Sequence, residues 1–223
     1  MKTTFLFLLG SAFCWGLSSC TAQQPKPEEV IEVINRVNNY WQETHPQHGR
    51  SFWDNAAYHT GNMEVFFLTG NPLYLEKLHE CWTYANSIMY DVEEGLYYRD
   101  GKYVYPKHKS VNGKKDFWAR GDGWVLAALA KVLKDLPETD QYRREYIDRF
   151  RTMAKSVAAC QQPEGYWTRS MLDPKHAPGP ETSGTAFFTY GLLWGMNNGL
   201  LDKAAYQPVV MKAWNYLTTI ALQ

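Results

Sequence analysis

Apolar residues recur along this chain every three to four positions, in segments separated by short turns that contain glycine and proline. This period places apolar side chains on one face of an α-helix. Strand signals are scarce, with one short strand pair expected between Tyr97-Tyr98 and Tyr103-Val104-Tyr105. The pattern therefore predicts an all-α fold. Helices are predicted over residues 30–41, 73–90, 125–133, 142–160 and 206–223.

Three parts of the chain repeat one plan: an aromatic or small-residue start, a long apolar helix, a turn and a second, amphipathic helix. They begin near Phe52, Phe117 and Ser183, and the first two starts lie 65 residues apart. In these two copies a Glu-Gly-aromatic segment follows, at Glu94 and Glu164. Each hairpin must bury its apolar face on its neighbours. The repeat predicts three antiparallel helical hairpins, with the turns at residues 118–124 and 181–185 on the same end of the assembly.

Bulk composition narrows the function classes. Lys+Arg and Asp+Glu number 23 each, so charge gives no argument for a nucleic-acid partner. Aromatic residues make up 15% of the chain, which suits either a packed core or a carbohydrate-binding cleft. No Cys/His cluster has zinc-ligand spacing, and no glycine motif for phosphate or dinucleotide binding is present. Neither a metal nor a cofactor is expected.

The N-terminal segment has the features of an export signal. Lys2 precedes a short apolar stretch within residues 1–20, which is too short for a membrane span. The sequence Leu17-Ser18-Ser19-Cys20 resembles a bacterial lipobox, so Cys20 is the expected lipidation site; cleavage near Ala22 is the alternative. A polar tether is expected over residues 21–29. The predicted location is the periplasm or outer membrane, with a lipid anchor as the sole membrane contact.

Two further cysteines, Cys81 and Cys160, lie in the apolar pattern of predicted second helices. Cysteine in such a position behaves as a small hydrophobic residue, which favours two free buried thiols. A disulfide between neighbouring hairpins is the alternative in an exported protein.

One stretch, residues 116–124, combines an acid, tryptophans, an arginine and two glycines at the start of a predicted helix. Glycine permits close approach of the backbone to a ligand. The faces of Trp118 and Trp124 suit apolar sugar surfaces, and the planar fork of Arg120 suits a carboxylate. The stretch indicates either a pocket for an acidic sugar or a helix start with buried tryptophans and a surface ion pair.

Other candidate site residues lie at the starts of the first and third hairpins. Asp54, beside Trp53, is either a helix N-cap or a pocket acid with a raised pKa. His59 in the same hairpin is a candidate ligand contact, although a lone histidine is more often structural. Thr182 and Ser183 offer hydroxyl and amide donors at a helix start, which favour anions; an ordinary capped helix is the alternative.

These motifs resemble unsaturated rhamnogalacturonyl hydrolases of glycoside hydrolase families 105 and 88. The resemblance covers residues 50–223 and implies an (α/α)6 barrel of helical hairpins in an exported enzyme of pectin breakdown. It rests on Trp118-Ala119-Arg120-Gly121-Asp122-Gly123-Trp124, Pro180-Glu181-Thr182-Ser183-Gly184-Thr185-Ala186 and Asn197-Asn198-Gly199.

The resemblance also implies a substrate and a mechanism. The family removes a 4,5-unsaturated galacturonyl unit from an oligosaccharide, so the implied partner is an unsaturated uronic-acid oligosaccharide. An aspartate protonates the double bond, water adds, and the hemiketal opens, unlike the usual two-carboxylate displacement. Arg120 and Trp124 match the family's substrate-contacting arginine and tryptophan. Position 122 is usually asparagine, so Asp122 adds a negative charge near the substrate unless it is paired or protonated.

The chain departs from the family in length and in its acid. Family members have six hairpins, so an incomplete barrel with an internal deletion near Gly70 and a shortened C-terminus is expected. The family acid precedes a Thr-Gly turn, and Asp54 lies 15 residues before Thr69, about one residue out of register. Three alternatives remain: an active hydrolase with Asp54 as acid, a non-catalytic binder of acidic sugars, or an inactive deletion product. Slow turnover is expected because an open half-barrel leaves the acid exposed to water.

Overall fold

The computed structural model describes residues 26–44 and 53–222, the side chains of Gln42 and of residues 53–60 excepted. The chain divides into two compact units, residues 1–47 and 48–223.

In the first unit, helix α1 spans Pro27–Thr44 and so extends beyond the predicted range of 30–41 at both ends. Proline suits the first position of a helix, where its missing N–H costs nothing. Glu28 and Glu29 in the first turn complement the positive end of the helix dipole. The expected tether over residues 21–29 therefore overlaps the start of this helix.

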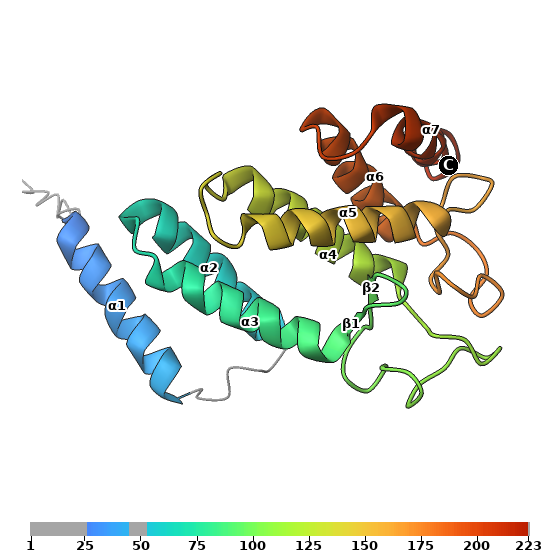
Figure 1. Ribbon diagram of the computed structural model, residues 1–223. Coiled ribbons are helices and arrows are strands. Elements are labelled where there is room, and N and C mark those ends of the chain that lie inside the picture. The colour runs from blue at the N-terminus through green and yellow to red at the C-terminus, as the bar shows by residue number, and fades with distance from the viewer. Residues whose placement is uncertain (1–25, 45–52, 223) are drawn as a thin grey trace, which may run out of the picture. The chain divides into compact units, whose positions relative to one another are not determined.

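The second unit consists mainly of three helical hairpins, as the repeat predicts (Figure 1). The first helix of each pair packs on the second. The all-α class is confirmed for the residues that the structure describes. The pairs are α2 (Trp53–Thr69) with α3 (Leu73–Met89), α4 (Ala119–Asp135) with α5 (Arg143–Ala159), and α6 (Thr182–Asn197) with α7 (Lys203–Asn215), which continues into a π-helical turn, Tyr216–Ile220.

The predicted strand pair is wrong in one partner. The observed hairpin joins β1 (Tyr90–Asp91) to β2 (Leu96–Tyr97), with Tyr90 opposite Tyr97. Gly95 closes the turn with φ 68°, and its N–H donates to the carbonyl of Asp91 at 2.8 Å. This left-handed conformation is open to glycine and lets β2 fold back at once. Residues 103–105 instead lie in turns of the long segment before α4.

Helices α4 and α6 pack on each other through glycines. A Cβ atom on Gly184 would lie 2.7 Å from the carbonyl carbon of Ala119, and one on Gly191 would lie 2.8 Å from Cγ of Leu126. Both distances are below any normal Cβ contact, so only glycine permits this separation of the helices. The contact between Ala119 and Gly184 places the starts of α4 and α6 at the same end, which confirms the predicted arrangement.

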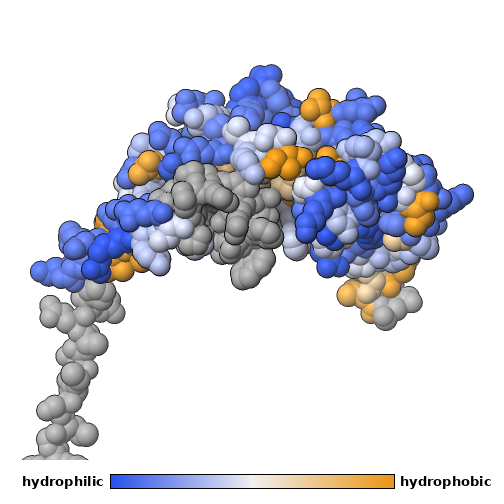
Figure 2. All heavy atoms as spheres, turned by 90° about the horizontal axis from the view of Figure 1, so that it is seen from below, coloured by the Kyte–Doolittle hydropathy of each residue, from blue (hydrophilic) through white to orange (hydrophobic). Residues whose placement is uncertain are grey.

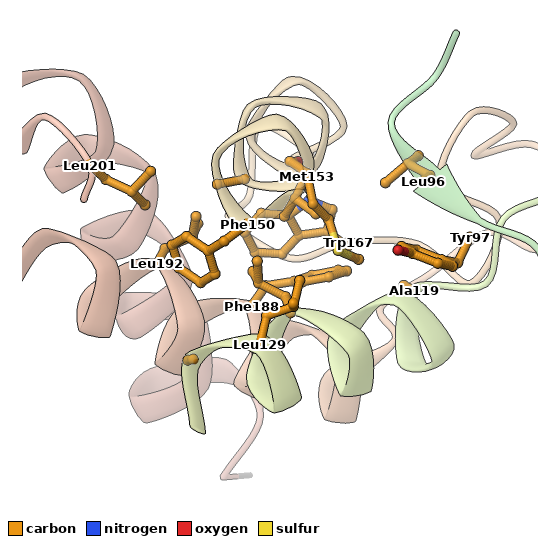
Figure 3. Close-up of a cluster of buried hydrophobic side chains, with 14 of the residues drawn as sticks. Leu96, Tyr97, Ala119, Leu129, Phe150, Met153, Trp167, Phe188, Leu192 and Leu201 are labelled. Atoms are coloured by element: carbon orange, nitrogen blue, oxygen red, sulfur yellow. The ribbon is translucent and has the colours of Figure 1, made fainter. Parts of the chain in front are cut away.

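A buried aromatic cluster lies where α4, α5 and α6 meet (Figure 3). Phe150 of α5, Phe188 of α6 and Trp167 from the connection between them are fully buried. The rings of Trp167 and Phe188 have centroids 5.1 Å apart, and the indole N–H of Trp167 donates to the carbonyl of Val157 at 2.7 Å. Burying each such side chain contributes about 1.5–3 kcal/mol, so this cluster fixes the end of the hairpins where the motifs lie.

Apolar side chains also remain exposed on α6 and α7, among them Tyr190 and Leu193 of α6 and Met211 and Trp214 of α7. The face drawn in Figure 2 is mostly hydrophilic, with separate apolar patches rather than one continuous band. None of the helices in the described ranges is both long and apolar enough to cross a membrane.

Cys81 and Cys160 are free thiols, as favoured by their apolar surroundings, although both are partly rather than fully buried. Burial raises the pKa of both thiols, so they stay protonated and unreactive near neutral pH. The predicted signal peptide and Cys20 lie outside the described residues.

Candidate functional site at the starts of α4 and α6

The starts of α4 and α6 are held together by the chain that connects α5 to α6. The N–H of Ala119 donates to the carbonyl of Arg169, and the N–H of Glu181 donates to the carbonyl of Trp167, at 3.0 and 2.8 Å. Glu181 then caps α6, because its carboxylate accepts from the N–H of Gly184. The predicted residues Arg120, Thr182 and Ser183 are thereby brought to one end of the two helices.

Arg120 forms an ion pair with the largely buried Glu181. Its Nε and Nη2 donate to Oε1 of Glu181 at 3.2 and 3.0 Å, and its Nε also donates to the hydroxyl of Ser183 at 2.8 Å. The Arg120 side chain remains 44% exposed, against 9% for Glu181. Among the described residues, nothing accepts from Nη1 of Arg120. One edge of the fork is therefore fixed by the protein, and the side chain stays nearly half exposed.

Two tryptophans flank this arginine. The guanidinium carbon of Arg120 lies 5.1 Å from the ring centroid of Trp118, and the rings of Trp118 and Trp124 have centroids 6.3 Å apart. Trp124 is 55% exposed, which is high for so large an apolar side chain. An exposed cation beside an exposed aromatic face suits a ligand with both a carboxylate and a sugar ring. Arg120, Trp118 and Trp124 are called the Arg120 surface below.

The two hydroxyl residues of the α6 start are already bonded within the protein. The hydroxyl of Ser183 donates to Oε1 of Glu181 at 2.6 Å, and that of Thr182 shares a 2.7 Å hydrogen bond with the hydroxyl of Tyr216. Ser183 thus supports Arg120 directly. Both remain candidate ligand contacts because Thr182 is exposed and Ser183 is half-buried.

Asp122 lies away from the exposed surface and is fully buried. Its Oδ1 accepts from the N–H of Tyr97 at 2.8 Å, and its Oδ2 has no partner among the described groups. Burial raises the pKa of the Asp122 carboxyl well above its ordinary value. The raised pKa favours the neutral carboxyl, and the burial of Asp122 keeps it from facing a ligand, so the negative charge expected at position 122 is not presented to a substrate. As placed, Asp122 offers no atom to a ligand on the Arg120 surface.

A neighbouring set of charged groups surrounds Asp116, whose side chain has no exposure. Nη1 of Arg169 donates to both carboxylate oxygens at 2.7 and 2.6 Å, and His108 Nε2 lies 3.0 Å from Oδ2. Burial alone would raise the pKa of Asp116, but hydrogen bonds from Arg169 and His108 hold that pKa below its usual value. The ring of Tyr103 packs on His108 with centroids 4.1 Å apart. These four residues are called the Asp116 cluster below.

No role was predicted from the sequence for His108 or Arg169, although a signal was present. Arg99 and Arg169 occupy the same place after the two Glu-Gly-aromatic segments, five positions beyond each glutamate. Both contribute to the surroundings of His108, since the Arg99 guanidinium lies 3.6 Å from the ring centroid of Tyr103. The arginine that follows each Glu-Gly-aromatic segment was therefore the sequence signal for this region.

Trp53, Asp54 and His59 lie on α2, within the part whose side chains are outside the described set. Their predicted roles remain predictions. In the described part of the chain, no three His, Cys, Asp or Glu side chains gather in a way that suits a metal ion.

The comparisons with known proteins agree on one family. The sequence model of Glycosyl Hydrolase Family 88 matches residues 67–223, beginning within α2. The unsaturated 3S-rhamnoglycuronyl hydrolase of Formosa agariphila is 40% identical over 153 residues, which cover 67% of this chain and 41% of that protein. This chain thus spans about two fifths of the length of that relative.

Two solved structures are also similar. A glycosyl hydrolase family 88 protein from Bacteroides vulgatus is 60% identical with a TM-score of 0.78, over 88% of this chain and 56% of that one. A structure titled as a polysaccharide lyase is 54% identical with a TM-score of 0.69, over 88% of this chain and 85% of that one. Families 88 and 105 have the (α/α)6-barrel fold, which accounts for the hairpins observed. The chain belongs to glycosyl hydrolase family 88.

Proposed function

We propose that this protein is a glycoside hydrolase that acts on oligosaccharides ending in a 4,5-unsaturated uronyl unit, of the kind found in rhamnogalacturonan. The observation that carries the proposal is the Arg120 surface. An arginine fork with one edge fixed by Glu181 and Ser183 presents its other edge to solvent beside Trp124. The name of the Formosa agariphila relative, an unsaturated rhamnoglycuronyl hydrolase, supports this substrate class.

In this proposal Arg120 binds the uronate carboxylate and Trp124 stacks on a sugar ring. Because Glu181 and Ser183 hold the fork in place, little side-chain entropy is lost when the carboxylate binds. The reaction itself adds a proton and water across the double bond, after which the hemiketal opens and releases the next sugar. Asp54 is the candidate acid that the sequence offers, and a chain without its family acid is the alternative.

Methanol trapping tests the proposed reaction, because a methoxy group stays on the carbon to which it is added, whereas the carbonyl oxygens of the product exchange with water. In water that contains methanol, addition across the double bond places a methoxy group on C5 of the uronyl unit, which NMR locates. A methyl glycoside formed at the anomeric carbon instead would indicate ordinary glycosidic transfer and overturn the proposal. Asp54→Asn should abolish methanol addition if Asp54 is the acid, with the exposed Asp148→Asn as a matched control.

A second candidate function is β-elimination within a polyuronate. It is favoured by the likeness to the polysaccharide lyase structure, which extends over most of both chains. Elimination also starts from a uronate carboxylate held by a cation, so the Arg120 surface suits it as well. The two functions differ in the double bond, since hydration consumes it and elimination forms it. Elimination takes up no solvent oxygen.

We also propose that the protein is exported and anchored by a lipid on Cys20. The support is the short apolar segment and the Leu17-Ser18-Ser19-Cys20 motif. Metabolic labelling with a fatty acid should mark the wild type and not the Cys20→Ser variant. Equal labelling of both would contradict the anchor.

A further inference from the structure

The Asp116 cluster has a geometry that suits proton transfer. The pKa of the Asp116 carboxyl is held low, so the group is ionised and only accepts hydrogen bonds. The His108 nitrogen 3.0 Å away must therefore be the donor, which places the proton on Nε2. In the neutral ring, Nδ1 then carries the lone pair. Among the described residues, no group forms a hydrogen bond to Nδ1 of His108, and the side chain is 32% exposed.

This arrangement is more than a structural ion pair. Arg169 alone already bonds both oxygens of Asp116, so the buried charge is paired without His108. The carboxylate nevertheless fixes the tautomer and direction of His108, in the way that a buried aspartate orients a catalytic imidazole. Tyr103 supports one face of the ring, and Arg99 packs behind Tyr103. The histidine is held rigidly while one nitrogen stays available.

The cluster adjoins the Arg120 surface. Asp116 precedes Arg120 by four residues, and the backbone carbonyl of Arg169 accepts from the N–H of Ala119 at 3.0 Å. Trp118 lies between them in sequence and pairs with Ser170 across a β-bridge. The segment that carries His108 has six Lys or Arg and one Asp over residues 99–115. Arg99 and Lys115 pair with nearby carboxylates, and the other four cations keep the segment basic. A polyanionic sugar chain would be attracted to this region.

We propose that His108, oriented by Asp116, is the general base that acts at C5 of the uronyl ring bound on the Arg120 surface. This inference rests on the function proposed above and supplies it with a base. In the hydration, a carboxyl group donates a proton to C4, and the π electrons become the C4–H bond. The water oxygen bonds to C5, and Nδ1 of His108 takes the proton that the water loses. In an elimination, the same nitrogen would take the proton of C5 itself, while the C4–O bond breaks and the leaving oxygen is protonated.

Chemical rescue tests the role of His108. In His108→Ala, kcat should fall about a hundredfold or more, the usual contribution of a general base, and imidazole in the buffer should restore part of it. His108→Gln, whose amide can still donate to Asp116, should keep the fold and the KM but lose kcat without rescue. His176→Gln is the matched control, because His176 accepts from the N–H of Val111 and lies 3.8 Å from Asp116, beyond hydrogen-bond range. Its activity should match the wild type.

The outcomes separate this inference from the proposed function. If both His108 variants turn over substrate within a few-fold of the wild-type rate, His108 is not the general base, while the proposed function still holds. A loss of activity in a folded His108→Ala protein that imidazole never restores would also overturn it, since it indicates a structural role. A wild type that neither consumes nor forms the double bond would overturn both. Turnover that is lost in His108→Ala and regained with imidazole supports both.

Discussion

Nη2 of Arg120 on α4 lies 3.0 Å from Oε1 of Glu181, the residue that caps α6. One carboxylate thus caps one helix and fixes an arginine from the next. The two residues lie 61 positions apart in sequence, so the contact depends on the close packing of α4 against α6. It orients the exposed edge of Arg120 at the place where the resemblance to the family expects a uronate.

Arg120→Ala should weaken binding of an unsaturated uronyl disaccharide. Removal of one side of a charge-assisted contact costs about 2–5 kcal/mol in a buried site, and this half-exposed site should lie at the lower end. Titration calorimetry measures the change. Arg144→Ala is the control, since Arg144 forms only an exposed pair with Asp148 on α5. Equal affinities of wild type and Arg120→Ala would show that Arg120 does not contact the disaccharide.

Trp124→Ala should reduce affinity for the same disaccharide several-fold without loss of thermal stability, because the side chain already lies mostly in solvent. Trp214 on α7 offers a close control, since both tryptophans are 55% exposed. Trp214→Ala should leave binding unchanged. Fluorescence quenching on ligand addition should be smaller in the Trp124 variant, where only Trp118 remains on the Arg120 surface, and unchanged in the Trp214 variant. Undiminished quenching in the Trp124 variant would place the sugar elsewhere.

Asp122→Asn should stabilise the protein increasingly as the pH rises. The folded-state pKa of Asp122 is raised, so the folded protein binds more protons than the unfolded chain above the unfolded pKa of about 3.9. Stability of the wild type is therefore lost as the pH rises from that value towards the folded pKa. Asparagine does not titrate and avoids this loss. Thermal unfolding from pH 4 to pH 8 should show a growing difference, and a constant difference would contradict a protonated Asp122.

Two glycine substitutions at mid-helix positions should have opposite effects. A Cβ on Gly195 of α6 would lie 2.6 Å from Cε1 of Phe150 and 2.8 Å from Cδ1 of Leu201, whereas a Cβ on Gly61 of α2 meets nothing within 4 Å. Overpacking typically costs about 1–3 kcal/mol, while alanine gains up to about 1 kcal/mol over glycine in an open helix. Gly195→Ala should lower the unfolding midpoint and Gly61→Ala should raise it. A stabilising Gly195→Ala would contradict the packing of α6 on α5.

The hairpins and their common end could be predicted from the sequence, because helical periodicity and the repeated starts at Phe117 and Ser183 report local structure and its neighbours. The strand pair was misassigned because tyrosines suit strands in general, whereas the turn at Gly95 decides which strand pairs. The burial of Asp122 could not be predicted from the sequence either. Residues two positions apart on a helix point about 200° apart, so the exposed Arg120 and the buried Asp122 share one motif without sharing one environment.

The Asp116 cluster also could not be predicted from the sequence, for a different reason. Arg169 reaches Asp116 from 53 residues away, and His108 reaches it from within an irregular segment without a helical or strand period. Such contacts follow from the tertiary fold rather than from spacing. The repeated arginine after each Glu-Gly-aromatic segment was the one local trace of this arrangement.

The ultraviolet absorbance of the uronyl double bond tests the central claim most directly. The protein should be mixed in parallel with an unsaturated uronyl disaccharide and with a saturated polyuronate. We expect a loss of absorbance with the first, abolished or greatly slowed in Arg120→Ala, and no change with the second. A gain of absorbance with the saturated polymer would contradict the hydrolase and identify a lyase, and no change with either substrate would contradict catalysis at the Arg120 surface.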